Sequence, residues 1–132
     1  MTNARILLIE DDKFLRKACE VSLKKRGLTV ITAIDGEEGL RLARTDTPDL
    51  ILLDMLMPKL SGFDTLDALK KDEQTRGIPV VMISNSSVDT DIQRAKELGA
   101  AGYLVKASLS LQELGNHVFS YLEGTAQTTE NS

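Results

Sequence analysis

The sequence predicts an α/β fold, a doubly wound five-stranded parallel sheet with helices on both faces. Five short apolar runs recur along the 132 residues, and stretches with helical spacing separate them. Continuous, often β-branched runs are typical of strands that are buried on both faces. Strict alternation of strand and helix favours the doubly wound class over other architectures. The predicted strands are Ile6–Ile9, Thr29–Ile34, Leu50–Leu53, Val80–Ile83 and Tyr103–Val105.

Length and composition fit one domain, since a single domain typically takes ~100–200 residues. Apolar residues make up 42% and charged residues 27% of the chain, which argues against disorder. A formal charge of −4 does not favour nucleic-acid binding, and one Cys with one His is poor material for a zinc site. The first apolar run is too short for a signal peptide or a membrane span. We expect one cytoplasmic domain over residues 1–124 and a polar, disordered tail over 125–132.

The first helix is expected between the first two strands. It ends at residues 24–27, where cations meet the negative end of the helix dipole and a glycine can cap the last turn. The cluster Lys24-Lys25-Arg26 is explained by this position. The apolar stripe of the helix consists of Leu15, Ala18, Cys19 and Leu23. Because Cys19 lies on the stripe, we interpret it as a core residue rather than a reactive thiol.

The second strand and the second helix follow directly. The run Thr29–Ile34 mixes Thr and Ala with Val and Ile, which fits an edge strand better than a central one. Asp35 can cap the next helix, which carries Glu37 and Glu38 in its first turn. The inward-facing residues of this helix are expected to be Leu40 and Ala43.

The third and fourth helices are marked by a start and a stop. Ser61 followed by Asp64 begins the third helix, and Gly99 ends the fourth. The predicted buried residues are Phe63, Leu66 and Leu69 in the third helix, and Ile92, Ala95 and Leu98 in the fourth.

The last helix has the clearest start. Ser110 and Glu113 form a capping box, and Leu109 with Leu114 forms the matching hydrophobic staple. Its predicted stripe is Leu111, Leu114, Val118 and Leu122. His117 lies off this stripe, so we interpret it as an exposed residue without a role in the chemistry rather than a phosphotransfer histidine.

Chemically competent side chains follow four of the five predicted strands. In a doubly wound sheet the functional crevice lies beyond the carboxyl ends of the strands. A single polar residue there is most simply a solvated loop residue, but a shared position at one edge favours a functional site. The residues are Glu10, Asp11 and Asp12 after the first strand, Asp54 after the third, Ser84 after the fourth and Lys106 after the fifth.

If the first and third strands are neighbours, Glu10, Asp11 and Asp54 converge. Two like charges ~4 Å apart repel by ~4 kcal/mol at an effective dielectric of about 20, so the site either holds a proton or recruits a cation. Carboxylate oxygens with open positions suit Mg²⁺. Lys106 adds a positive charge and Ser84 a hydroxyl. These are the groups needed for phosphoryl transfer in which a carboxylate is the nucleophile.

Four segments carry a resemblance to a known family. They are Ile6–Asp12, Pro48–Pro58, Ile78–Ser84 and Gly99–Lys106. With these segments in order, the sequence resembles the receiver domain of bacterial two-component response regulators over roughly Ala4 to Glu123. The resemblance implies a flavodoxin-like (βα)5 fold with strand order 2-1-3-4-5.

The resemblance also implies the roles of the acidic residues. Asp54 corresponds to the aspartate that accepts a phosphoryl group from a phosphohistidine of a sensor kinase. Glu10 and Asp11 correspond to the acidic pair that holds Mg²⁺, Asp11 as a direct ligand and Glu10 through water. The backbone carbonyl of Leu56 corresponds to a third protein ligand. Asp12 falls beyond the pair and is expected to be solvated or to cap the first helix.

Ser84 resembles the hydroxyl residue that swings to the phosphoryl oxygen, and Tyr103 the aromatic switch that turns inward behind it. Lys106 resembles the lysine that stabilises the phosphoryl group, but Ala107 stands where proline commonly follows. A cis bond before a non-proline residue costs ~3–4 kcal/mol, so we predict a trans Lys106–Ala107 bond. Leu56 and Ser86 occupy positions that tune the lifetime of the phosphoryl group in the family.

The resemblance implies an output surface on the fourth helix, fifth strand and fifth helix. Tyr103 lies on that strand, and a vacated Ser84 position would admit its ring. Phe119 and Tyr121 lie at the margins of the last helix's stripe. Either they widen the apolar surface that a partner uses, which we favour, or they complete the core.

The function implied is a phosphorylation-dependent signalling switch. It assists its own phosphorylation and slow autodephosphorylation and is not a metabolic enzyme. The expected partners are a sensor histidine kinase or phosphotransfer protein and a downstream protein target, without nucleic acid or membrane. Two alternatives are a phosphorelay intermediate that passes the group to a phosphotransfer histidine, and an interaction module that ignores phosphorylation.

Two rival classes fit the residues less well. A nucleotide or flavin binder needs a small, donor-rich loop after the first strand, where Glu10-Asp11-Asp12 would repel phosphate. A phosphohydrolase resembling the haloacid dehalogenase family carries a second Asp two places after its nucleophile, where this chain has Leu56.

Overall fold

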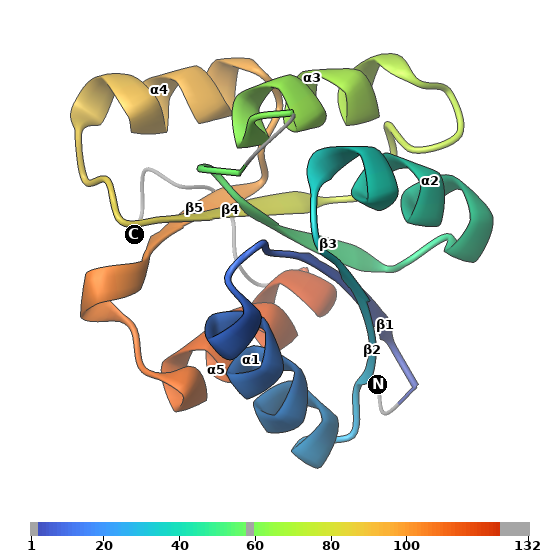
Figure 1. The fold of residues 1–132 in the computed structure, drawn as a ribbon, viewed down its shortest axis with the longest axis vertical. Coiled ribbons are helices and arrows are strands. Elements are labelled where there is room, and N and C mark those ends of the chain that lie inside the picture. Colours follow the sequence, from blue (N-terminus) through green and yellow to red (C-terminus); the bar gives the residue numbers. More distant parts are fainter. Residues whose placement is uncertain (1–2, 58–59, 125–132) are drawn as a thin grey trace.

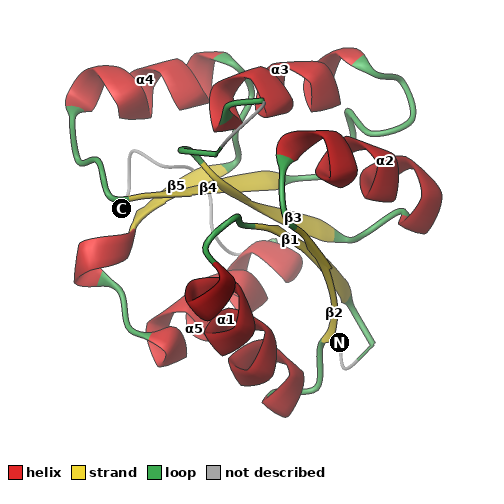
Figure 2. Ribbon diagram, in the orientation of Figure 1, coloured by secondary structure: helices red, strands yellow, loops and turns green. Residues whose placement is uncertain are grey.

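The computed structural model describes residues 3–57 and 60–124, which form a five-stranded parallel sheet between two layers of helices (Figures 1 and 2). The predicted fold class and strand order are confirmed, since the order across the sheet is β2-β1-β3-β4-β5. The predicted tail, residues 125–132, lies outside the described residues. The strands are β1 (Arg5–Ile9), β2 (Thr29–Ala33), β3 (Leu50–Asp54), β4 (Val80–Ser84) and β5 (Gly102–Val105).

The helices divide between the two faces of the sheet (Figure 1). Alternate side chains of each strand point to opposite faces, so Ile6 and Leu8 pack on one side and Leu7 and Ile9 on the other. The first face is covered by α1 (Lys13–Lys25) and α5 (Leu111–Leu122), and the second by α2 (Gly36–Asp46), α3 (Gly62–Lys71) and α4 (Asp89–Glu97). Cys19 is 3% exposed in the first core, as expected from its place on the stripe.

Four of the five helices begin at a polar side chain that accepts a backbone N–H of the first turn. Ser110 and Glu113 make both hydrogen bonds of the predicted capping box. The Asp12 carboxylate accepts from the N–H groups of Phe14 and Leu15, so this residue caps α1. The other two caps are Asp35 for α2 and Ser61 for α3. In α4 the N-cap is Val88, which has no side-chain hydrogen bond to offer.

Two apolar residues are more exposed than the sequence pattern suggests. β2 ends at Ala33, and Ile34 is 53% exposed beyond the end of the strand. Leu111 was expected on the buried stripe of α5 but is 40% exposed. It lines a groove between α1 and α5 together with Val21, because the first turn of α5 faces α1 rather than the sheet.

Phe119 and Tyr121 support the alternative in which they complete the core. Both rings are half-buried and pack against the α1/α5 side of the sheet. The Tyr121 hydroxyl lies where a Cβ on Gly102 would be. The guanidinium of Arg26 lies 5.0 Å from the centre of the Phe119 ring. The two rings therefore contribute to the core, while part of each stays exposed.

Arg26 does more than interact with the end of α1. Its Nη1 donates to the carbonyl of Gln112 (3.2 Å), and its Nη2 donates to Oδ1 of Asn116 (3.0 Å). A side chain at Gly115 would collide with this guanidinium, so the glycine leaves room for it. Arg26 thus joins α1 to α5, a contact between distant segments that capping rules do not anticipate.

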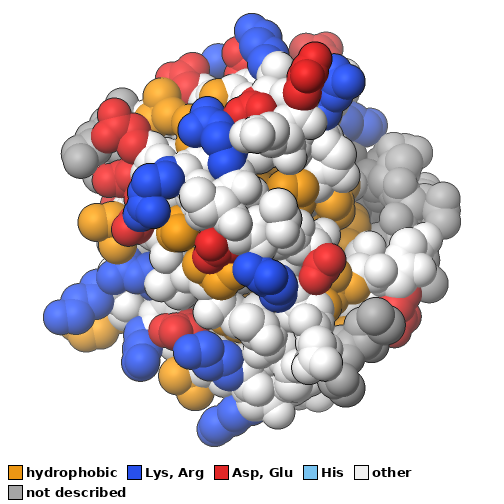
Figure 3. All heavy atoms as spheres, turned by 90° about the vertical axis from the view of Figure 1, so that its right-hand side faces the viewer, with side chains coloured by type: hydrophobic (Ala, Val, Ile, Leu, Met, Phe, Trp, Pro, Cys, Tyr) orange, Lys and Arg blue, Asp and Glu red, His pale blue; other side chains and the backbone are white. Residues whose placement is uncertain are grey.

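On the face shown in Figure 3, Lys and Arg side chains are interspersed with Asp and Glu. Ion pairs at the surface, such as Lys24–Glu20 and Lys71–Asp67, also occur in the described residues. Such a face differs from the continuous basic surface that binds nucleic acid. Within residues 3–57 and 60–124, every helix is too short or too polar to cross a membrane.

Candidate functional site

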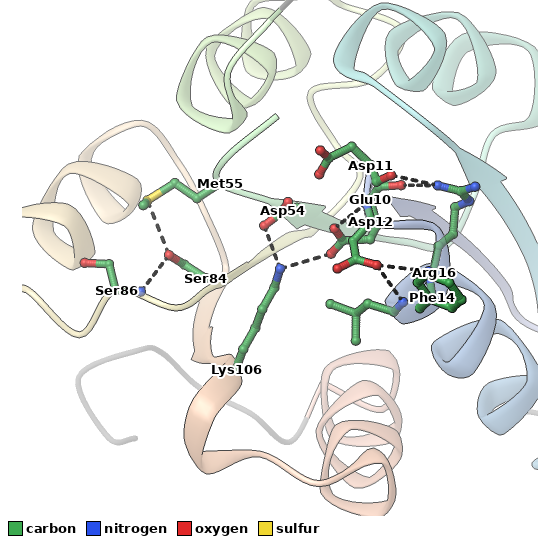
Figure 4. A network of polar contacts seen from close by, with 11 residues as sticks. Glu10, Asp11, Asp12, Phe14, Arg16, Asp54, Met55, Ser84, Ser86 and Lys106 are labelled. Carbon is green, nitrogen blue, oxygen red and sulfur yellow. Dashed lines mark hydrogen bonds and ion pairs between the residues drawn. The ribbon is translucent and has the colours of Figure 1, made fainter. Parts of the chain in front are cut away.

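The carboxyl edge of the sheet gathers the acidic residues singled out from the sequence. The β1–β3 register sets Ile9 beside Leu53, so Glu10 and Asp54 follow at the same level. One carboxylate oxygen from each of Glu10, Asp11 and Asp54 lies within 4.8 Å of the others. Figure 4 shows the three side chains around one space, with Asp12 turned toward the start of α1.

Lys106 reaches this cluster from the end of β5. Its Nζ lies 3.0 Å from Oδ1 of Asp54 and 3.2 Å from Oε1 of Glu10 (Figure 4). No peptide bond in the described residues is cis, so Lys106–Ala107 is trans as predicted. A short 3-10 turn, Lys106–Ser108, follows β5. It contains Ala107 at the position where a proline commonly follows the lysine in the family.

Burial dominates the electrostatics of the site. Glu10 is 1% exposed, and its burial, reinforced by the charge of Asp54, raises its pKa to about 7. Burial likewise raises the pKa of Asp54, against the opposing hydrogen bond from Lys106. Burial alone would lower the pKa of Lys106, but its contacts with Asp54 and Glu10 outweigh this and raise it. The ammonium is therefore held in its charged form.

The donor set fits a hard divalent cation. Oε1 of Glu10 is buried and accepts no hydrogen bond of good geometry, although the Lys106 ammonium lies 3.2 Å away. Three carboxylates face a single ammonium group, so negative charge is in excess. The hollow between them measures about 210 Å³ and is lined by Leu56 as well. Since one water takes ~30 Å³, it has room for a hydrated ion beside a phosphoryl group. These residues fit Mg²⁺.

Ser84 and Tyr103 meet at the sulfur of Met55, next to the cluster. The Ser84 hydroxyl donates to Met55 Sδ (3.6 Å) and accepts the Ser86 N–H (3.0 Å), as Figure 4 shows. The Tyr103 hydroxyl donates to the Ser86 carbonyl (3.0 Å) and also contacts Met55 Sδ (3.7 Å). The ring is 5% exposed and already turned inward. In this structure the Tyr103 ring is therefore inward while Ser84 also contacts Met55.

Gly62 is a site residue that the sequence reasoning missed. A Cβ there would lie 2.6 Å from Cα of Met55 and would also collide with the carbonyl of Asp54. Its N–H donates to the Met55 carbonyl (2.8 Å). Only glycine allows the start of α3 to lie against the backbone that carries Asp54. His117, by contrast, lies half-buried on α5 and does not line the carboxylate hollow.

Comparison with known proteins agrees with this geometry. The model of the response regulator receiver domain family matches residues 6–119. The chain belongs to this family. Receiver domains act as signalling switches, not as metabolic enzymes, and typically bind Mg²⁺ at an acidic pocket.

Several receiver-domain proteins are similar over most of this chain. It is 40% identical to the transcriptional regulatory protein AfsQ1 of Streptomyces coelicolor over 101 residues, 76% of this chain and 44% of AfsQ1. It is 38% identical to PilH of Pseudomonas aeruginosa over 103 residues, 78% of this chain and 85% of PilH. The Francisella response regulator 1452 receiver domain superimposes with a TM-score of 0.85 at 29% identity, covering 93% of this chain and 99% of that one. The receiver domain spans about half the length of several curated relatives it matches.

The raised pKa of Glu10 predicts that the metal-free receiver domain loses folding stability as the pH rises. A folded pKa of about 7 against the ordinary 4.5 means that the folded state binds this proton more tightly than the unfolded chain. The resulting stabilisation is complete below the unfolded pKa and is lost as the pH rises through the folded pKa. In EDTA, Glu10→Gln should therefore gain stability over the wild type, by about 2 kcal/mol, between about pH 5 and about pH 8.

Urea unfolding followed by circular dichroism at the two pH values measures this difference. The exposed Glu37→Gln serves as a matched control and should show the same offset from the wild type at both. An offset for Glu10→Gln that does not change with pH would contradict the assignment.

Proposed function

We propose that Asp54 accepts a phosphoryl group from a phosphohistidine of a sensor kinase, with Mg²⁺, and that the modification alters the surface of α4, β5 and α5. The observation that carries this proposal is the position of Asp54 inside the hollow. Its carboxylate lies 3.0 Å from the Lys106 ammonium and beside Glu10 and Asp11. The proposal includes a cytoplasmic location.

The transfer follows from these positions. A carboxylate oxygen of Asp54 attacks the phosphorus and forms a new P–O bond, while the P–N bond to the donor imidazole breaks and its electron pair returns to that nitrogen. Lys106 is placed to donate to an oxygen of the transferring group. Asp11, Asp54 and the carbonyl of Leu56 would hold Mg²⁺ directly and Glu10 through water. When bound, the ion supplies positive charge to the phosphoryl oxygens.

The reverse path is hydrolysis. A water that enters the same hollow attacks the phosphorus, and Asp54 leaves as a carboxylate. This slow autodephosphorylation returns the switch to its starting state and needs no metabolic substrate. Leu56, which is 69% exposed at the rim, is placed to limit the access of that water.

The partner surface is proposed on α4, β5 and α5. A hollow of about 330 Å³ lies there, lined by Ile92 of α4, Tyr103 of β5 and His117 of α5 among others. Its mixture of apolar and polar side chains suits another protein. The relative AfsQ1 is named a transcriptional regulatory protein, which favours signal output over onward transfer in a phosphorelay.

Incubation with acetyl phosphate and Mg²⁺ tests the proposal. We expect intact-protein mass spectrometry to show one added phosphoryl group, and EDTA to prevent the addition, because the excess negative charge of the cluster would then repel the donor. An unmodified protein in Mg²⁺ would favour the alternative, an interaction module independent of phosphorylation. Equal modification in EDTA would contradict the role of Mg²⁺.

A further inference from the structure

The loop between β4 and α4 places Ser86 in contact with three parts of the molecule at once. Its N–H donates to Oγ of Ser84 (3.0 Å) at the end of β4. Its carbonyl accepts from the hydroxyl of Tyr103 (3.0 Å) on β5. Its own hydroxyl donates to Oδ2 of Asp91 (2.6 Å) in the first turn of α4. One residue therefore joins the edge of the phosphoryl site to both neighbouring elements of the proposed output surface.

The start of α4 depends on this residue. Val88 is the N-cap and cannot accept a first-turn N–H with its side chain. Instead, the Val88 N–H donates to the Ser86 hydroxyl (3.2 Å), which in turn donates to Asp91. The other four helices begin at Asp or Ser caps of their own. Ser86 thus satisfies the N–H of the N-cap residue and connects the loop to the first turn of α4.

Few apolar contacts hold α4 in place. Among its nine residues, all of them described, Ala95 is the one that is buried. In α3, by comparison, five of ten residues are buried. A helix with so little buried surface takes its position from the polar contacts at its ends, and a change in those contacts displaces it readily.

We propose that the Ser86–Asp91 hydrogen bond is the link through which the phosphoryl state of Asp54 reaches α4. This inference rests on the proposed function. When the Ser84 side chain rotates toward a phosphoryl oxygen, its oxygen moves away from the Ser86 N–H, and the hydrogen bond between them is lost. The backbone of Ser86 then rearranges, and its side chain transmits the change to Asp91. Ser86 and Asp91 are positioning residues here and take no part in the transfer itself.

Amide NMR spectra with and without beryllofluoride and Mg²⁺ test this link, since beryllofluoride mimics the aspartyl phosphate. In the wild type, shift changes should extend from Asp54 and Ser84 to residues 89–97. In Asp91→Ala, the changes at Asp54 and Ser84 should remain, while those in α4 fall by roughly half or more. A merely structural role of Asp91 would alter the free spectrum but leave these induced changes intact.

Two controls complete the test. Asp89→Ala removes the same charge from an exposed position in the same helical turn and should keep the wild-type pattern. Ser86→Ala should behave as Asp91→Ala does, and Ser86→Thr, which keeps the hydroxyl, should restore the transmission.

The outcomes separate this inference from the proposed function. Full shift changes in α4 of Asp91→Ala, or an equal loss in Asp89→Ala, would overturn the link alone. Shift changes at Asp54 and Ser84 of the wild type without shift changes in α4 would also overturn it. A wild type without any response at Asp54 would overturn both.

Discussion

Substituting Asp54 by asparagine should abolish phosphoryl incorporation from acetyl phosphate. An amide lacks the anionic oxygen that attacks phosphorus, and no other carboxylate in the hollow lies 3.0 Å from Lys106 at the end of a central strand. Glu10 also contacts this ammonium, at 3.2 Å, but in the proposed function it holds Mg²⁺ through water. Mass spectrometry of the intact protein and of its peptides measures the result.

Asp12→Asn is the matched control for this loss. It removes one carboxylate from the same edge of the sheet, but asparagine caps a helix as well as aspartate does, so α1 should persist. We expect this variant to be labelled as the wild type is. Full labelling of Asp54→Asn would place the acceptor elsewhere.

Replacing Asp11 by alanine should weaken Mg²⁺ binding more than replacing Glu10 or Asp12. Asp11 is exposed and its carboxylate is free to coordinate directly, whereas Glu10 is buried and is expected to act through water. Removing even an outer-shell partner typically costs ~10–100-fold in metal affinity, and a direct ligand should cost at least as much.

A titration of Mg²⁺ followed by amide NMR shifts ranks three variants. We expect the damage to decrease from Asp11→Ala to Glu10→Gln to Asp12→Ala, because the last carboxylate is engaged as a helix cap. Unchanged affinity in Asp11→Ala would contradict direct ligation. The affinity of Asp12→Ala also shows whether loss of the cap disturbs the site.

Sequence patterns predicted the scaffold because they reflect local physics. Period and β-branching mark the strands, and polar caps mark four helix starts, of which the Ser110–Glu113 box is the clearest. The convergence of Glu10, Asp11 and Asp54 then follows from strand order, because the carboxyl ends of parallel strands share one edge.

The remaining features depend on competition between segments that are distant in sequence. The Ser84 hydroxyl could turn to the hollow, to Met55 or to Ser86, and no local pattern decides among these. Tyr103 is turned inward because its hydroxyl donates to the Ser86 carbonyl and contacts the Met55 sulfur. Arg26, about ninety residues earlier in the chain, lies over the Phe119 ring and donates a hydrogen bond to Asn116. The exposure of Leu111 likewise follows from where α1 lies.

The contrast between α3 and α4 bears on how such a protein diversifies. Gly62, at the start of α3, lies against the backbone of Asp54, the proposed acceptor, so a side chain there would disturb the proposed site. In α4, Ala95 is the buried residue, and exposed positions such as Asp89, Gln93 and Glu97 can change with little effect on folding free energy. Under the proposed function, mutation of these exposed positions can redirect the signal to a new recipient while the phosphorylation chemistry is unchanged.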